Sequence, residues 1–140
     1  VATGSGGTQG GLVAGMQLLD GAPVIGIAVE GDRREQEALA TRQAAESLRL
    51  LGRADIDLSG QVNVMDDFVG PGYARPTDTM REALGLAARF EGLVLDPVYT
   101  GKAFAGFLSL ARSGRFDKKQ SLLFVHTGGT PGLFGYPEAI

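Results

Sequence analysis

The sequence of 140 residues contains no cysteine, one histidine and three lysines. Without cysteine the chain forms no disulfide and offers no thiolate to a metal, and His126 alone cannot build a multi-histidine site, so we expect no metal centre. The lysines Lys102, Lys118 and Lys119 and the scattered arginines leave a net charge of −3. Because nucleic-acid surfaces need clustered Lys and Arg, we expect no nucleic-acid partner.

Long apolar runs are absent as well. No run approaches the ~20 residues that span a bilayer, and no basic-then-apolar signal segment opens the chain. We therefore expect no membrane partner and a cytoplasmic location. The chain also lacks an initiator methionine, which favours a segment of a longer chain. The length and the apolar fraction of 44% predict one globular domain over residues 1–140.

Apolar runs alternate with helical stretches along the chain. The runs predict strands over residues 23–30, 61–65, 92–95 and 121–125, the second of them an exposed or edge strand. Helical spacing marks residues 32–51, 77–90 and 100–111. This alternation predicts an α/β fold, with a mainly parallel sheet covered by helices.

The spacing of apolar residues also predicts which helix faces are buried. For residues 32–51 the predicted inward residues are Ala38, Ala45, Leu48 and Leu51, with Gly52 ending the helix. For residues 77–90 they are Met80, Leu84, Ala87 and Ala88, with Thr77 as N-cap.

Residues 2–11, ATGSGGTQGG, form a loop with five glycines before an apolar helical run. Such a backbone approaches an anion closely, and a helix N-terminus adds partial positive charge. Three interpretations stay open. The loop could bind one phosphoester group, with help from the Thr8 hydroxyl. It could be part of a dinucleotide site in which Glu30 binds the ribose, although Gln9 stands where the third glycine of that motif belongs. The third interpretation is a structural turn.

Three segments follow the carboxyl ends of predicted strands: the glycine loop, residues 96–99 and residues 126–128. In parallel sheets, ligands bind beyond these ends, so we expect the segments to converge on one crevice. Within them, Asp96 is predicted to hold a turn and His126 to be structural. Asp66 and Asp67 are predicted to cap a loop or to carry solvated charge.

Four segments occur in this order in one family: ATGSGGTQGG, DDFVGPGYARP (residues 66–76), GLVLDPVYTGKAFAG (92–106) and FVHTGGTPGLFGY (124–136). With them the chain resembles the pyridoxal-phosphate enzymes that include D-cysteine desulfhydrase, L-cysteate sulfo-lyase and 1-aminocyclopropane-1-carboxylate deaminase. The resemblance implies the C-terminal part of the large domain of a fold type II, tryptophan-synthase β-like enzyme. It also implies pyridoxal 5'-phosphate as cofactor and a small amino acid as substrate.

The resemblance assigns roles to single residues. It implies that Tyr73 and Tyr99 are catalytic and face the substrate, Tyr99 holding its carboxylate or delivering a proton. Thr100 is implied to contact the pyridine nitrogen, besides a role in capping the helix. The deaminase branch has glutamate at that position, so threonine favours the desulfhydrase-like branch and a β-elimination giving pyruvate and ammonia. The residues implied to bind the cofactor phosphate are Gly4, Ser5, Gly6, Gly7 and Thr8.

The resemblance also implies a missing part. It places the Schiff-base lysine in a segment far upstream, and none of the three lysines present fits that role. We therefore expect the chain alone to be inactive and to bind the cofactor non-covalently at best. The alternative is a non-catalytic phosphate-binding or interaction domain. In either case we expect apolar faces that pair with the N-terminal segment or form a homo-oligomer such as a dimer.

Overall fold

The computed structural model describes residues 1–139. The elements in chain order are β1 (Ala2–Thr3), α1 (Gly7–Leu18), β2 (Ile25–Ala28), α2 (Arg33–Leu50), β3 (Asn63–Met65), α3 (Asp78–Leu86) and α4 (Thr100–Arg112). A π-helical turn, η1 (Ala87–Glu91), continues α3, and the short 3-10 helices η2 (Thr130–Gly135) and η3 (Pro137–Ala139) follow α4. No helix in these residues is both long and apolar enough to cross a membrane.

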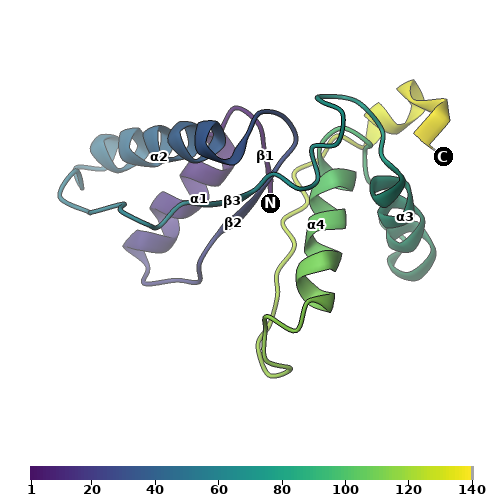
Figure 1. The fold of residues 1–140 in the computed structure, drawn as a ribbon. Helices are drawn as coiled ribbons and strands as arrows, with labels where there is room; N and C mark the ends of the chain where they lie inside the picture. Colours follow the sequence, from purple (N-terminus) through teal and green to yellow (C-terminus); the bar gives the residue numbers. More distant parts are fainter. Residues whose placement is uncertain (140) are drawn as a thin grey trace.

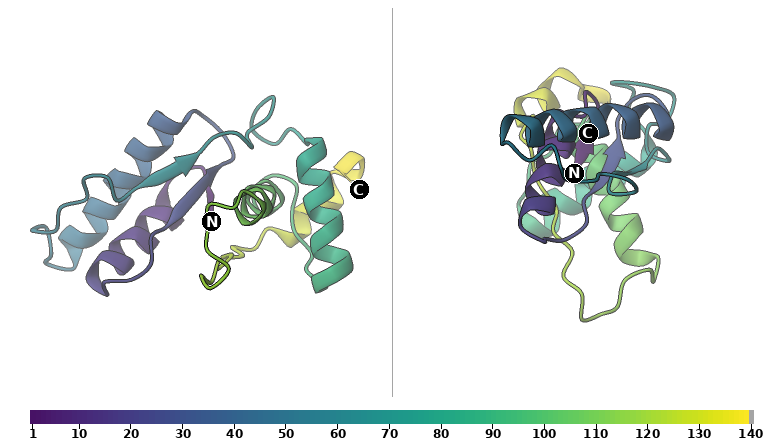
Figure 2. Two further views of the ribbon diagram at one scale, coloured as in Figure 1. Left: turned by 60° about the horizontal axis from the view of Figure 1, so that its bottom comes forward. Right: turned by 90° about the vertical axis from the view of Figure 1, so that its left-hand side faces the viewer.

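The three strands form a parallel sheet in the order β1-β2-β3, with Ala2 opposite Ile27 and Gly26 opposite Val64. Helices α1 and α2 connect consecutive strands and lie on one face of the sheet, while α4 lies on the other (Figures 1 and 2). Helix α3 packs on the side of α4 that faces away from the sheet (Figure 2). The predicted α/β class, with helices on both faces of a parallel sheet, is confirmed.

Each layer of this arrangement has its own buried cluster. Between α4 and the sheet, Ala103 packs with Ile27 and Val29. A Cβ added at Gly106 would lie 2.6 Å from the Ile27 side chain, so glycine lets α4 lie directly on the sheet. The cluster on the opposite face consists of Val13, Ala14, Ala28, Ala40, Ala44, Leu48, Val62 and Val64. The cluster between α3 and α4 consists of Met80, Ala83, Leu84, Ala87, Leu95, Phe104, Ala105 and Ala139.

The predicted inward face of α2 is largely wrong. Leu48 is buried as expected, but Ala38, Ala45 and Leu51 are exposed, and the buried stripe runs through Ala40 and Ala44. The reason is the close approach of α1: a Cβ at its Gly10 would meet the Ala40 carbonyl at 2.7 Å. The two helices therefore pack through their smallest side chains, and hydrophobicity does not distinguish one alanine from the next.

The ends of the helices follow the sequence more closely. Gly52 follows Leu51, the C-cap of α2, with φ +73°, and Thr77 accepts from the Met80 amide at 3.2 Å as the N-cap of α3. Met80, Leu84 and Ala87 are buried as predicted. Ala88 is exposed, because the helix changes to π-helical hydrogen bonding at Ala87–Glu91 and the inward face shifts.

Two of the four predicted strands form. Residues 23–30 and 61–65 contain β2 and β3, and β3 lies at an edge of the sheet. Residues 92–95 and 121–125 are wrong as strands, since within residues 1–139 neither pairs with another strand. Leu95 is buried between α3 and α4, but other apolar side chains of these runs have no neighbouring strand to cover them: Val94 is 43% and Leu123 84% exposed.

Candidate functional site

The N-terminal end of α4 and the glycine loop share the carboxyl edge of the sheet. Helix α4 crosses β2, with Gly106 against Ile27 and Ala103 in the cluster of Ile27 and Val29. Tyr99, just before α4, lies near Glu30, which follows the end of β2. The negative charge of the Glu30 carboxylate contributes to raising the pKa of the Tyr99 phenol. Glu30 also lies beside the glycine loop, because a Cβ added at Gly4 would lie 3.1 Å from Glu30 Oε1.

The glycine loop is held by contact with α2. Gly6 has φ +78°, and a Cβ there would lie 2.8 Å from the Ala40 nitrogen and 2.9 Å from the Leu39 carbonyl carbon. These are backbone atoms, so no side chain fits without moving a helix. On the other side of the loop, Ser5, Gly7 and Thr8 are exposed. The loop is thus fixed on its inner side and accessible on its outer side.

Helix α1 begins without a cap of its own. No side chain accepts from its first amides, and its first turn holds no acidic residue. The first amide with a partner is that of Gly10, which donates to the Gly6 carbonyl at 2.8 Å. Within the described residues, the amides of Gly7, Thr8 and Gln9 have no acceptor. Gly7 and Thr8 are exposed and Gln9 is buried, so the unused donors of Gly7 and Thr8 and the positive end of the helix dipole are accessible from solvent and fit a phosphate group.

The turn before α4 is built in the opposite way. Asp96 is 2% exposed, and its carboxylate accepts four hydrogen bonds. Oδ2 accepts from the amides of Val98 and Tyr99, both at 2.8 Å. Oδ1 accepts from the Thr100 amide at 2.8 Å and its hydroxyl at 2.7 Å. The prediction that Asp96 holds the turn is confirmed.

Thr100 belongs to this capping network. Its hydroxyl donates to Asp96 and also accepts from the Asp96 amide at 2.9 Å, and the residue is 1% exposed. The N-cap position itself is occupied by Tyr99. The contact between Thr100 and a pyridine nitrogen stays a prediction.

Tyr73 and Tyr99, which are 26 residues apart in sequence, meet in space. Their hydroxyls form a hydrogen bond, and their rings pack edge to face with centroids 5.9 Å apart. The bond to Tyr73 raises the pKa of Tyr99 to about 12, with smaller contributions from burial and from the negative charges of Glu30 and Asp96. The side chains are 46% and 40% exposed, so a small molecule reaches both phenols.

The segment that follows residues 121–125 packs against the turn that contains Asp96. Gly129 has φ +85°, and a Cβ there would lie 2.7 Å from Asp96 Oδ1. His126 Nδ1 accepts from the Gly128 amide at 3.0 Å, and Nε2 lies 3.4 Å from the Val94 carbonyl. The hydrogen-bond partners of His126 are backbone groups, which supports its structural interpretation. Asp66 accepts from the Arg33 amide at 2.9 Å and so caps the helix α2, whereas the sequence predicted loop capping or solvated charge.

Sequence reasoning missed the role of Lys102. The residue is 0% exposed, and its ammonium donates to the carbonyls of Val69 at 2.7 Å and Gly72 at 2.8 Å. Burial lowers the pKa of Lys102. One signal was available in the sequence: a single lysine inside the otherwise apolar stretch of α4, three residues after Tyr99.

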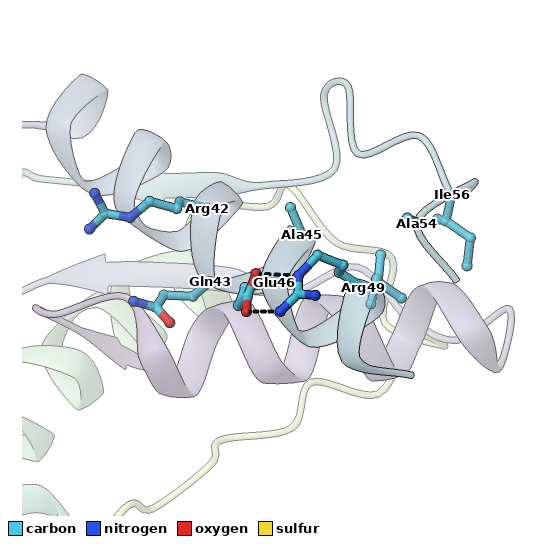
Figure 3. Close-up of a pocket in the computed structure, with 8 residues that line it drawn as sticks. Arg42, Gln43, Ala45, Glu46, Arg49, Ala54 and Ile56 are labelled. Carbon is cyan, nitrogen blue, oxygen red and sulfur yellow. Dashed lines mark hydrogen bonds and ion pairs between the residues drawn. The ribbon is translucent and has the colours of Figure 1, made fainter. Parts of the chain in front are cut away.

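A separate groove of about 550 Å³ lies on the outer side of α2 (Figure 3). Its charged walls include Arg49 and Glu46, which bind each other through two hydrogen bonds of 2.6 and 2.9 Å. The groove contains none of the predicted site residues. Its lining consists of Arg42, Gln43, Ala45, Glu46, Leu48, Arg49, Ala54 and Ile56.

Comparisons with known proteins agree with this geometry. Residues 1–128 match the sequence profile of the family described as "Pyridoxal-phosphate dependent enzyme". The chain belongs to this family. Among solved structures, a crystal structure of an ACC deaminase homologue superposes with a TM-score of 0.85 at 34% identity, over 99% of this chain and 41% of the other. The fold is accordingly that of a fold type II pyridoxal-phosphate enzyme.

Curated members of the family are similar over the same stretch. D-cysteine desulfhydrases of Klebsiella pneumoniae (strain 342) and Salmonella typhi are each 44% identical over 140 aligned positions, covering 97% of this chain. The chain spans 41% of the length of these relatives.

Pyridoxal phosphate is the cofactor of this family. The residues present fit its phosphate, because the start of α1 offers uncapped amides beside two exposed hydroxyls, Ser5 and Thr8. Within residues 1–139, no group of three or more His, Cys, Asp or Glu side chains is placed to hold a metal ion.

Proposed function

We propose that this chain supplies the phosphate loop and the tyrosine pair of a lyase that cleaves a Cβ–S bond in a small amino acid such as D-cysteine, giving pyruvate and ammonia. The observation that carries the proposal is the placement of the Tyr73–Tyr99 pair and an uncapped helix start at one sheet edge. The 44% identity to D-cysteine desulfhydrases supports the choice of substrate class.

The proposal divides the work among the chain's own residues. Gly4, Ser5, Gly6, Gly7 and Thr8 would hold the cofactor phosphate, and Thr100 would lie at the pyridine nitrogen. When bound, pyridoxal phosphate supplies an electron sink that acidifies the α-hydrogen of an amino acid. Tyr99, with its raised pKa, stays protonated at neutral pH. It would donate a hydrogen bond to the substrate carboxylate or deliver a proton.

No lysine of the chain is free for the covalent role in this site. Lys102 is buried on two carbonyls, and Lys118 and Lys119 are exposed in a turn after α4. We therefore propose that the Schiff-base lysine comes from another segment and that these 140 residues alone do not turn over substrate. The expected compartment remains the cytoplasm.

Two rival functions remain. One is a non-catalytic domain that binds phosphate or pyridoxal phosphate, in which the tyrosine pair would have no chemical role. The other is ACC deaminase activity, which the similarity to the solved ACC deaminase homologue suggests but for which Thr100 is the less suitable residue.

Cofactor binding is tested by a carboxylate placed at the helix start. Gly7→Asp puts a negative charge among the uncapped amides, where only Ser5 Oγ lies as close as 4.0 Å to the new Cβ. We expect the dissociation constant for pyridoxal phosphate to rise on the order of tenfold. Gly11→Asp is the matched control, since it lies one turn further along α1 with nothing within 4 Å.

Absorbance titration of the purified chain measures this affinity, and borohydride reduction followed by mass spectrometry detects covalent attachment. Equal affinities for the two aspartate variants would remove the helix start from the cofactor site. A reduced adduct on Lys102 would contradict the proposal that the covalent lysine lies elsewhere.

The lyase activity itself is tested on the protein expressed from its complete reading frame. With D-cysteine we expect release of sulfide, pyruvate and ammonia, and Tyr99→Phe should lower kcat at least ~100-fold, the usual contribution of a proton-transferring group. An enzyme that binds pyridoxal phosphate but releases no pyruvate from D-cysteine would favour the non-catalytic domain. Release of 2-oxobutanoate from 1-aminocyclopropane-1-carboxylate would favour the deaminase.

We also propose that the chain self-associates or docks on its N-terminal segment. Sedimentation over a range of concentrations measures this, and a monomer at every concentration would refute self-association. The exposed apolar side chains that motivate it include Leu19, Leu50, Leu51, Phe90, Leu123 and Phe134.

A further inference from the structure

Lys102 and Tyr99 come from the same turn of α4 and hold the same loop. Tyr99 binds the Tyr73 hydroxyl, and Lys102 binds the carbonyls of Val69 and Gly72, so three contacts fasten residues 69–73 to one helix end. Figure 1 shows the segment between β3 and α3 passing over the N-terminal end of α4.

Besides these contacts, Val69 packs against the cluster beneath α1 and α2, and the loop forms two long backbone hydrogen bonds of its own, each of 3.3 Å. Gly70 and Gly72 adopt φ +66° and +144°, and Ala74 adopts φ +56°, which is unusual for a residue with a Cβ. A segment with such backbone angles samples many conformations unless its surroundings select one. The two carbonyls that point at Lys102 belong to Val69 and Gly72, which come just before Tyr73 in the chain.

Burial of the Lys102 ammonium at this position is unfavourable for the stability of the fold. Within residues 1–139, no carboxylate forms a salt bridge with Lys102, and the two acceptors of its ammonium are neutral carbonyls. A buried cation without a counter-charge costs stability, and an apolar residue in this helix would avoid that cost. A reason for this cost would be that the two hydrogen bonds of Lys102 fix the conformation of the loop.

We propose that Lys102 is a positioning residue, whose two hydrogen bonds to the loop carbonyls place the Tyr73 phenol against that of Tyr99. Lys102 acts through Tyr73 and has no contact with reacting atoms. The inference goes beyond the proposed function and can be tested without cofactor or substrate, so failure of one leaves the other standing.

The test observes the tyrosine pair directly. The chain has three tyrosines, so ¹³C-tyrosine NMR gives few signals, assigned by single replacements with phenylalanine. In the unchanged chain we expect an NOE between the Tyr73 and Tyr99 rings and no titration of Tyr99 up to about pH 11, since its pKa is raised to about 12. In Lys102→Met we expect loss of this NOE and a fall of more than about one unit in the pKa of Tyr99. Lys118→Met, an exposed lysine after α4, is the control and should change neither signal.

The absence of cysteine allows a chemical rescue. In Lys102→Cys the new thiol is unique, so alkylation under denaturing conditions modifies that site alone. Bromoethylamine rebuilds a lysine-like side chain ending in an ammonium, while iodoethane gives the same chain without nitrogen. After refolding, we expect the first product to regain the NOE and the resistance of Tyr99 to titration, and the second to lack both.

Three results would overturn the proposal. The pair could keep its NOE in Lys102→Met, or the two alkylated proteins could behave alike. The ethylated protein could also lose its helical circular dichroism altogether, in which case Lys102 supports the whole fold and does not act on the tyrosine pair.

Discussion

Two helices, α1 and α4, begin at the same sheet edge, but a side chain accepts hydrogen bonds from the first amides of α4 only. At α4, the buried Asp96 carboxylate accepts from the amides of Val98, Tyr99 and Thr100. At α1, the amides of Gly7, Thr8 and Gln9 have no acceptor in the described structure. A helix start is available to an anion only where the protein has not supplied one itself.

The other two α-helices confirm that the start of α1 is the exception. Helix α2 is capped by Asp32 and Glu35 in a capping box, and by Asp66 from the end of β3. Helix α3 is capped by Thr77. Of the four α-helices in residues 1–139, α1 alone begins without a side chain that accepts from its first turn.

The largest expected effect on stability comes from removing Asp96, which caps the start of α4. Asp96→Ala removes four hydrogen bonds to a buried carboxylate and leaves three amides unpaired, so we expect a loss of about 4 kcal/mol in the free energy of unfolding. Urea denaturation followed by circular dichroism measures it. Asp32→Ala, the exposed cap of α2, is the matched control, with an expected loss of about 1 kcal/mol. Equal losses would show that the closed turn is no more important than an ordinary cap.

A smaller effect on stability is expected from a substitution in the glycine loop, at the uncapped start of α1. Gly6→Ala needs a left-handed conformation and pushes on the backbone of α2, so we expect a loss of about 2 kcal/mol and weaker binding of pyridoxal phosphate. Gly7→Ala, with open space around the new Cβ, should change stability by less than about 1 kcal/mol. The same denaturation assay compares them, and a stability equal to that of Gly7→Ala would contradict the seating of Gly6 on α2.

The smallest effect separates the two roles of Thr100. Thr100→Val removes one donor and one acceptor from the Asp96 network, for an expected loss of about 1.5 kcal/mol, whereas Thr100→Ser keeps both. If the hydroxyl also touches the pyridine nitrogen, the absorbance maximum of the bound cofactor shifts in the valine variant alone. Identical spectra in both variants would leave Thr100 with its capping role only.

Local signals in the sequence predicted much of this structure. Alternating runs and helical spacing located β2, β3 and the helices, and short-range chemistry identified Thr77, Gly52 and Asp96. These features depend on neighbours within a few residues. The strands expected over residues 92–95 and 121–125 failed because a strand needs a partner, and apolar composition does not say whether one is adjacent.

The parts of the site that sequence reasoning missed depend on contacts across the fold. Lys102 meets carbonyls 30 and 33 residues earlier in the chain, and Glu30 approaches Tyr99 only because α4 crosses β2. The buried face of α2 depended in the same way on Gly10 of another helix. Spacing within one helix could not reveal any of these contacts.

The seating of Gly6 on α2 has a thermodynamic consequence. Because Gly6 of the glycine loop is already fixed against the backbone of Ala40 and Leu39, a phosphate group bound there as proposed would meet amides that need no ordering. Calorimetry should then show binding with a favourable enthalpy and little entropic penalty from the chain, and only a small change in heat capacity.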